Sequence, residues 1–153
     1  MSDFFALIAV LGTAVVYGTD VFCALVQRPA LAQVDDRALV AVMGNVHRYG
    51  DRRMPVPGVI GLVAAAVSAV LAAASGRAIP AIAAGVAVGL LVVWLGLYLS
   101  VSAPINRQLT AAAGKPEPLM NARALQHHWD RVITIRAVLQ GFAVTALCAA
   151  LLT

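Results

Sequence analysis

The sequence predicts an all-α integral membrane protein: a bundle of four transmembrane helices, with an amphipathic helix on the cytoplasmic side between the first two spans. The composition carries this prediction, because 61% of the residues are hydrophobic and only 12% are charged, whereas soluble domains are about half apolar and a quarter charged. The mean hydropathy of +0.88 agrees with it. A chain of 153 residues has room for four spans of about 20 residues with short connections, so we expect one integral membrane domain over residues 1–153.

Four apolar runs are long enough to cross a bilayer, and we place the spans at about residues 4–27, 56–74, 81–103 and 132–152. No basic segment precedes the first run, so we interpret it as a retained span and not as a cleaved signal peptide. In the third run, Pro104 removes the N–H that would bond to the carbonyl of Ser100. We therefore expect that helix to bend near the membrane boundary.

Residues 35–49, between the first two spans, read as an amphipathic helix. Two aspartates can cap its first turn, and apolar residues recur behind them at spacings of three and four. The residues are Asp35 and Asp36, then Leu39, Val42, Met43 and Val46. We expect this helix to lie on the bilayer surface or to fold over the mouth of the bundle.

Small residues mark the faces on which helices can approach closely. The second span carries such a stripe, in the order Gly58, Gly61, Ala65, Ser68 and Ala72. The third span carries Gly85, Gly89 and Gly96. These stripes can serve helix packing within the chain or between copies. The partners that we expect are therefore the lipid bilayer and further copies of the chain in a homo-oligomer.

Polar residues form one stripe on each of three spans. Spacings of three, four and seven place the members of each stripe on one helix face. The first span carries Thr13, Tyr17, Asp20 and Gln27; the third carries Trp94, Tyr98, Ser102 and Asn106; the fourth carries Trp129, Arg136 and Gln140. Their depths agree to within about one helical turn, so we expect a polar pocket that opens toward the cytoplasm.

Asp20 and Arg136 are the opposite charges inside apolar runs. Each costs a few kcal/mol if it is left alone in hydrocarbon, and pairing removes most of that cost. We therefore predict that the two side chains meet, directly or through one shared partner such as Tyr98 or Asn106.

The basic residues predict the orientation of the chain. Ten of the eleven Lys and Arg residues fall in or beside the first and third connections, and only Arg77 falls in the second. By the positive-inside rule, those two connections are cytoplasmic and both termini lie outside. We expect a multi-pass protein of the plasma membrane.

Three histidines are candidate acid–base groups: His47 on the amphipathic helix, and His127 and His128 just before the fourth span. A base near the membrane surface could remove a proton from a hydroxyaromatic substrate, and Arg136 could hold the resulting anion. For His47 the alternative is a solvated surface residue, as a lone histidine beside an arginine on such a helix more often is.

Several classes of site have no support in the sequence. It contains no CxxC, HExxH, P-loop or dinucleotide fingerprint. The basic residues flank apolar runs and never form a block with interleaved aromatics. We therefore expect no metal, no cofactor and no nucleic-acid partner.

Three segments together resemble the anthrone-oxygenase-like family of small four-span membrane proteins, most of which have no assigned function. They are residues 17–22 leading to Pro29, residues 101–106 with their Pro-Ile-Asn, and the entry into the last helix from Trp129 to Arg136. The resemblance implies a four-helix membrane bundle and cofactor-independent insertion of molecular oxygen into an anthrone. It directs attention to Asn106, Trp129 and Arg136.

Three functions remain open at this point. The first is an enzyme or binding protein for a lipophilic aromatic such as an anthrone; its binding residues would be Tyr17, Asp20, Trp94, Tyr98, Ser102, Asn106 and Trp129. The second is a non-catalytic binding or assembly subunit whose buried charges only hold the bundle together. A small proton-coupled transporter is the third reading, because an intramembrane acid is what such a carrier uses.

Overall fold

The computed structural model describes residues 1–115 and 119–153, and every regular element in this part of the chain is a helix. In order, these are α1 (Ser2–Phe22), the π-helical turn η1 (Cys23–Gln27), α2 (Arg28–Leu31), α3 (Asp36–Arg53), α4 (Pro55–Ala74), α5 (Ala78–Leu97), the π-helical turn η2 (Tyr98–Ser102), α6 (Ala103–Ala112) and α7 (Ala122–Leu152). The all-α prediction is confirmed. Four continuous helical stretches are long and apolar enough to cross a membrane: Ser2–Leu31, Pro55–Ala74, Ala78–Ala112 and Ala122–Leu152.

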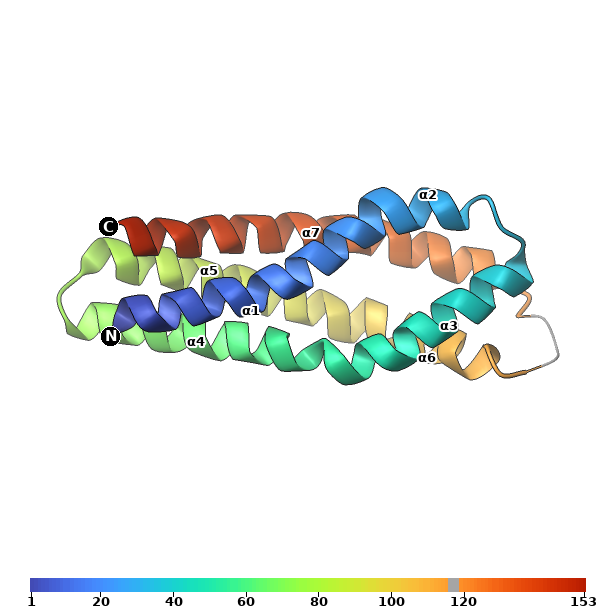
Figure 1. The fold of residues 1–153 in the computed structure, drawn as a ribbon, viewed down its shortest axis with the longest axis horizontal. Helices are drawn as coiled ribbons and strands as arrows, with labels where there is room; N and C mark the ends of the chain where they lie inside the picture. Colours follow the sequence, from blue (N-terminus) through green and yellow to red (C-terminus); the bar gives the residue numbers. More distant parts are fainter. Residues whose placement is uncertain (116–118) are drawn as a thin grey trace.

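The helices form an elongated bundle with two halves (Figure 1). In one half α1, α4, α5 and α7 run side by side, and both termini lie at the end of this half, next to the α4–α5 turn. The other half contains α2, α3, α6 and the start of α7. An even number of long helices returns the chain to the end where it began, which is the arrangement expected of four spans.

Helix α3 differs from the predicted surface helix. It begins as expected, because the Asp35 side chain accepts a hydrogen bond of 2.7 Å from the backbone N–H of Ala38. It then continues in the direction of α4, packs along α6 and extends the bundle (Figure 1). Met54 joins α3 to α4 in helical conformation, and Pro55, which has no N–H to lose in a first turn, starts α4.

The predicted apolar face of α3 is only half right. Leu39 and Met43 are fully buried, but Val42 and Val46 are exposed. The buried face instead runs through Val40, Gly44 and His47. The face is rotated because α6 covers α3 from the side of Gly44, whose missing side chain leaves room for Leu109 and Ala113.

Glycines bring α1 and α4 into backbone contact. A Cβ atom on Gly12 would lie 2.8 Å from the backbone nitrogen of Gly61, and one on Gly61 would lie 2.8 Å from the Thr13 hydroxyl. The close approach predicted for the second span is therefore confirmed at Gly61. In contrast, Cβ atoms on Gly85, Gly89 and Gly96 of α5 would meet nothing within 4 Å, so these glycines do not pack within the chain, and their use between copies stays a prediction.

The π-helical turn η2 keeps one face of the third span directed into the bundle. Trp94 and Asn106 are twelve residues apart, which in an uninterrupted α-helix would separate their side chains by about 120° around the axis. A π turn absorbs one extra residue, and the separation falls to about 20°. The turn lies directly before Pro104, whose missing N–H already interrupts the α-helical hydrogen bonds.

Candidate functional site

A buried ion pair joins the first and last spans. Nη2 of Arg136 on α7 donates to Oδ1 of Asp20 on α1 at 2.9 Å, and the two side chains are only 7% and 4% exposed. The predicted direct pairing is confirmed. Oδ2 of Asp20 accepts two further hydrogen bonds, from Nε2 of Gln140 at 2.6 Å and from Nε1 of Trp94 at 3.3 Å, so the carboxylate is well satisfied without water.

Arg136 is held from three more sides. Its Nη1 donates to the hydroxyl of Ser102 at 2.9 Å, and its guanidinium carbon lies 5.6 Å and 5.4 Å from the ring centroids of Trp94 and Tyr98. These two rings are stacked at an interplanar angle of 15°. Cation–π contacts of this kind are strongest in desolvated surroundings. The guanidinium group of Arg136 and the two rings therefore stabilise one another on one side of the bundle interior.

A second polar network begins one turn nearer the α3 end of the bundle. Oδ1 of Asp51 on α3 accepts from the Tyr98 hydroxyl at 2.9 Å and from Nδ2 of Asn106 at 2.8 Å. Oδ1 of Asn106 in turn accepts from Nε1 of Trp129 at 3.0 Å. This network ties α3 to the third and fourth spans.

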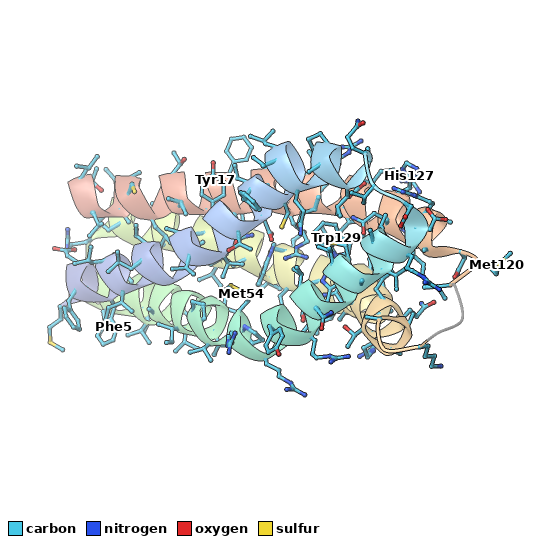
Figure 2. The ribbon with its side chains drawn as sticks, turned by 45° about the vertical axis from the view of Figure 1, so that its right-hand side comes forward. Phe5, Tyr17, Met54, Met120, His127 and Trp129 are labelled. Carbon is cyan, nitrogen blue, oxygen red and sulfur yellow. The ribbon has the colours of Figure 1, made fainter. Side chains whose placement is uncertain are left out.

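A cavity of about 140 Å³ lies between the two networks. Its apolar wall comes from Val16, Met54, Gly58, Val59, Leu62 and Leu95, and its polar wall from Asp20, His47, Asp51, Tyr98, Asn106 and Arg136. Both tryptophans of the chain, Trp94 and Trp129, also line it. Figure 2 shows Met54 and Trp129 turned toward the interior between α1, α3 and α7.

His47 is the buried titratable group in this wall that lies outside the spans. Its side chain is 4% exposed, its ring centroid lies 5.4 Å from that of Trp129, and Nε2 has no hydrogen-bond partner within residues 1–115 and 119–153. Burial lowers the pKa of His47 to about 4; the carboxylate of Asp51 opposes this shift and the charge of Arg136 adds to it. The imidazole is therefore neutral at pH 7 and able to accept a hydrogen bond.

The low pKa of His47 predicts a loss of stability in mild acid. The unfolded chain takes up the proton near pH 6.5 and the folded chain only near pH 4, so the free energy of unfolding should fall as the pH drops through this window, by up to about 3 kcal/mol. His47→Gln should remove that part of the pH dependence, with His127→Gln as the control that keeps it. Parallel unfolding curves for wild type and His47→Gln between pH 7 and pH 4 would contradict the burial argument.

The structure brings together most of the predicted site residues. Asp20, His47, Trp94, Tyr98, Asn106, Trp129 and Arg136 line the cavity, and Ser102 lies behind Arg136. Tyr17 does not belong to this group, because its ring packs against Gly141 in a separate groove between α1 and α7.

His127 and His128 also lie outside the cavity. Both are exposed, and Figure 2 shows His127 on the outer side of α7. The reason is the helical rotation of about 100° per residue: Gln126 and Trp129 face the interior, which turns the two positions between them outward. Of the three candidate histidines, only His47 reaches the cavity.

Asp51 and Met54 line the cavity but were not predicted from the sequence, although one signal for Asp51 was present. Asp51 follows His47 by four residues and so shares its helix face. Gln140 was assigned to the polar stripe of the last span but not to the site, and it makes the shortest bond to Asp20.

The fold and this site define the class: in the part of the chain that the structure describes, an all-helical protein with four helices long and apolar enough to cross a membrane, and with a mostly apolar cavity between them that a few polar side chains also line. Comparison with family models, with curated proteins and with solved structures finds no match. In the described residues no three His, Cys, Asp or Glu side chains are grouped so that they could hold a metal ion.

Proposed function

We propose that this is a multi-pass membrane protein that binds a lipophilic hydroxyaromatic molecule in the cavity. The observation that carries this proposal is the composition of the cavity wall: two tryptophans, the Tyr98 ring and an apolar face, with the neutral ring of His47 beside them. Aromatic and aliphatic walls with a few oriented polar groups are typical of small-molecule sites. The resemblance to anthrone-oxygenase-like proteins points to the same class of ligand.

The charges of the wall disfavour an anionic ligand. Asp20 and Arg136 neutralise each other at 2.9 Å, and Oδ1 of Asp51 is already bonded to two donors. The free acceptor at His47 fits the hydroxyl group of a phenol. We infer that the hydroxyl donates to His47 while the ring lies against the tryptophans.

The size of the cavity favours one aromatic ring over three. An engineered cavity of about 150 Å³ holds benzene, and this cavity has about 140 Å³. A polycyclic anthrone must therefore extend beyond the enclosed part or displace a lining side chain such as the flexible Met54.

We propose binding rather than catalysis as the primary function. Cofactor-independent oxygenation of an anthrone needs a base that removes a proton from the substrate. Moving a proton from a phenol of pKa about 10 to a histidine of pKa about 4 is uphill by about 8 kcal/mol, before any stabilisation of the anion by Arg136. The non-catalytic reading also accounts for Asp20, whose bonds all go to the bundle itself.

The cavity lies where the two halves of the bundle meet, and ten of the eleven basic residues fall on or toward the half that contains α2, α3 and α6. By the positive-inside rule we propose that this half faces the cytoplasm and that both termini lie outside. Alkaline phosphatase fused after Thr153 should then be active, and an inactive fusion would reverse the orientation.

The two tryptophans allow a direct test of binding. Because Trp94 and Trp129 both line the cavity and no other tryptophan is present, a brominated phenol should quench most of the intrinsic fluorescence by contact. His47→Leu should weaken the binding of the phenol about tenfold, which is the contribution of one hydrogen bond in a buried site. The binding of the matching brominated methyl ether should not change, because this compound has no hydroxyl group to donate.

Matched glycine substitutions control for access to the cavity. A Cβ atom on Gly58 would lie 3.5 Å from the Trp94 ring, so Gly58→Leu should fill the cavity and abolish quenching, whereas Gly89→Leu on the open face of α5 should not. Equal quenching in both variants would refute the cavity as the site. Oxygen uptake with an anthrone, one molecule per quinone formed, would show that the protein is an oxygenase.

A further inference from the structure

A second hollow lies on the outside of the bundle, along the seam between α1 and α7. It is a groove of about 470 Å³ and shares no lining residue with the cavity. Its walls are Tyr17, Val21, Ala24 and Leu25 on one side and Thr134, Ala137, Val138, Gly141, Phe142 and Thr145 on the other. The ring of Tyr17 packs against Gly141 within the groove, where a Cβ atom on Gly141 would lie 3.3 Å from that ring.

The groove has the length of one membrane leaflet. On α7 it extends from Thr134 to Thr145, eleven residues or about 16 Å of helix. The hydrocarbon core of a bilayer is about 30 Å thick, so one leaflet accounts for about half. Val138 and Phe142, on its α7 side, are 53% and 63% exposed, so the groove is open to the surroundings of the bundle.

Two arginines stand at one end of this groove. Arg28, at the start of α2, reaches across the seam, and its Nε lies 3.9 Å from Oδ2 of Asp130 on α7; its side chain remains 50% exposed. Arg131 is exposed and shares a helix face with Thr134 and Val138, three and seven residues further on. Asp130 also accepts a hydrogen bond from Gln126, and the cluster retains one positive charge in excess.

We propose that the α1–α7 groove binds an anionic phospholipid, with one acyl chain along the groove and the phosphate at Arg28 and Arg131. The length of the groove matches the thickness of one leaflet and so the length of an acyl chain. The excess positive charge at the end of the groove matches the negative charge of the phosphate. Basic residues at this level attract anionic lipids in the cytoplasmic leaflet. The site is independent of the proposed cavity ligand.

Purified protein, stripped of lipid by detergent exchange, should be titrated with phosphatidylglycerol and with phosphatidylcholine of the same acyl chains, and bound lipid counted by native mass spectrometry. We expect one molecule of phosphatidylglycerol to bind to each protein chain in preference to phosphatidylcholine. Each arginine contributes about fivefold to such binding, so Arg28→Gln with Arg131→Gln should weaken it about 25-fold. Val138→Trp should exclude the chain and also abolish binding.

The matched control is Arg48→Gln with Arg52→Gln, which removes two exposed arginines from α3 at the same end of the bundle and should leave the affinity unchanged. An equal loss in this control would reduce the effect to general surface charge and overturn the proposal. So would equal binding of the two lipids, or competition by glycerol phosphate at the same concentration as phosphatidylglycerol, which would indicate a site for free anions.

Discussion

Asp20→Asn and Arg136→Gln are each expected to destabilise the folded protein by about 3–5 kcal/mol, and the double substitution by less than either. The pair is almost fully buried, with side chains 4% and 7% exposed and 2.9 Å apart. Removing one member strands the other charge in a low-dielectric interior, where desolvation is not compensated. Removing both leaves two neutral polar groups that Gln140, Trp94 and Ser102 can still bond.

A double-mutant cycle measures this effect, with unfolding followed in detergent by tryptophan fluorescence. The coupling energy should be large and should favour the intact pair. The control is the pair Asp3 and Arg77, which also joins two helices, at 2.7 Å, but in side chains that are 54% and 35% exposed. Its removal should leave the unfolding midpoint nearly unchanged. Simple additivity for Asp20 and Arg136 would mean that each charge is stabilised by other groups.

Gly12→Ala should destabilise the protein by about 3 kcal/mol or more. The added Cβ atom would lie 2.8 Å from the backbone nitrogen of Gly61 and 2.8 Å from the carbonyl oxygen of Pro57. These are backbone atoms that cannot rotate away, so α1 and α4 must separate, and overpacking of this kind usually costs 1–3 kcal/mol even where side chains can yield. Because α4 carries Gly58 and Val59 of the cavity wall, the ligand site should widen as well.

Gly89→Ala is the matched control on α5. Its Cβ atom would meet nothing within 4 Å, so only helix propensity acts, and the change should be neutral or stabilising by up to about 1 kcal/mol. The comparison uses the same unfolding measurement. If Gly12→Ala proved as stable as Gly89→Ala, the close crossing of α1 and α4 would be wrong.

The local properties of the chain were readable from the sequence. Hydropathy and length determined the four long helices, because a span must satisfy its own backbone hydrogen bonds and so depends little on its neighbours. The pairing of Asp20 with Arg136 was also predictable, since an isolated charge in an apolar run costs enough to require a partner. Both predictions rest on free-energy costs that can be assigned to one segment alone: unsatisfied backbone hydrogen bonds and an unpaired charge in an apolar run.

Only the tertiary structure decided which polar residues share a wall. Polar stripes indicated which face of three spans turns inward, but the remaining faces of the spans are apolar, so their sequences carry little further information on rotation. The π turn before Pro104 decides that Trp94 and Asn106 face the same way, and the packing of α6 on Gly44 turns His47 inward. His127 and His128 face outward because Trp129 is buried instead. Each residue adds about 100° around a helix axis, but which side of a helix faces the bundle is set by contacts between distant helices, and that is why Asp51 could not be assigned to the cavity wall from the sequence.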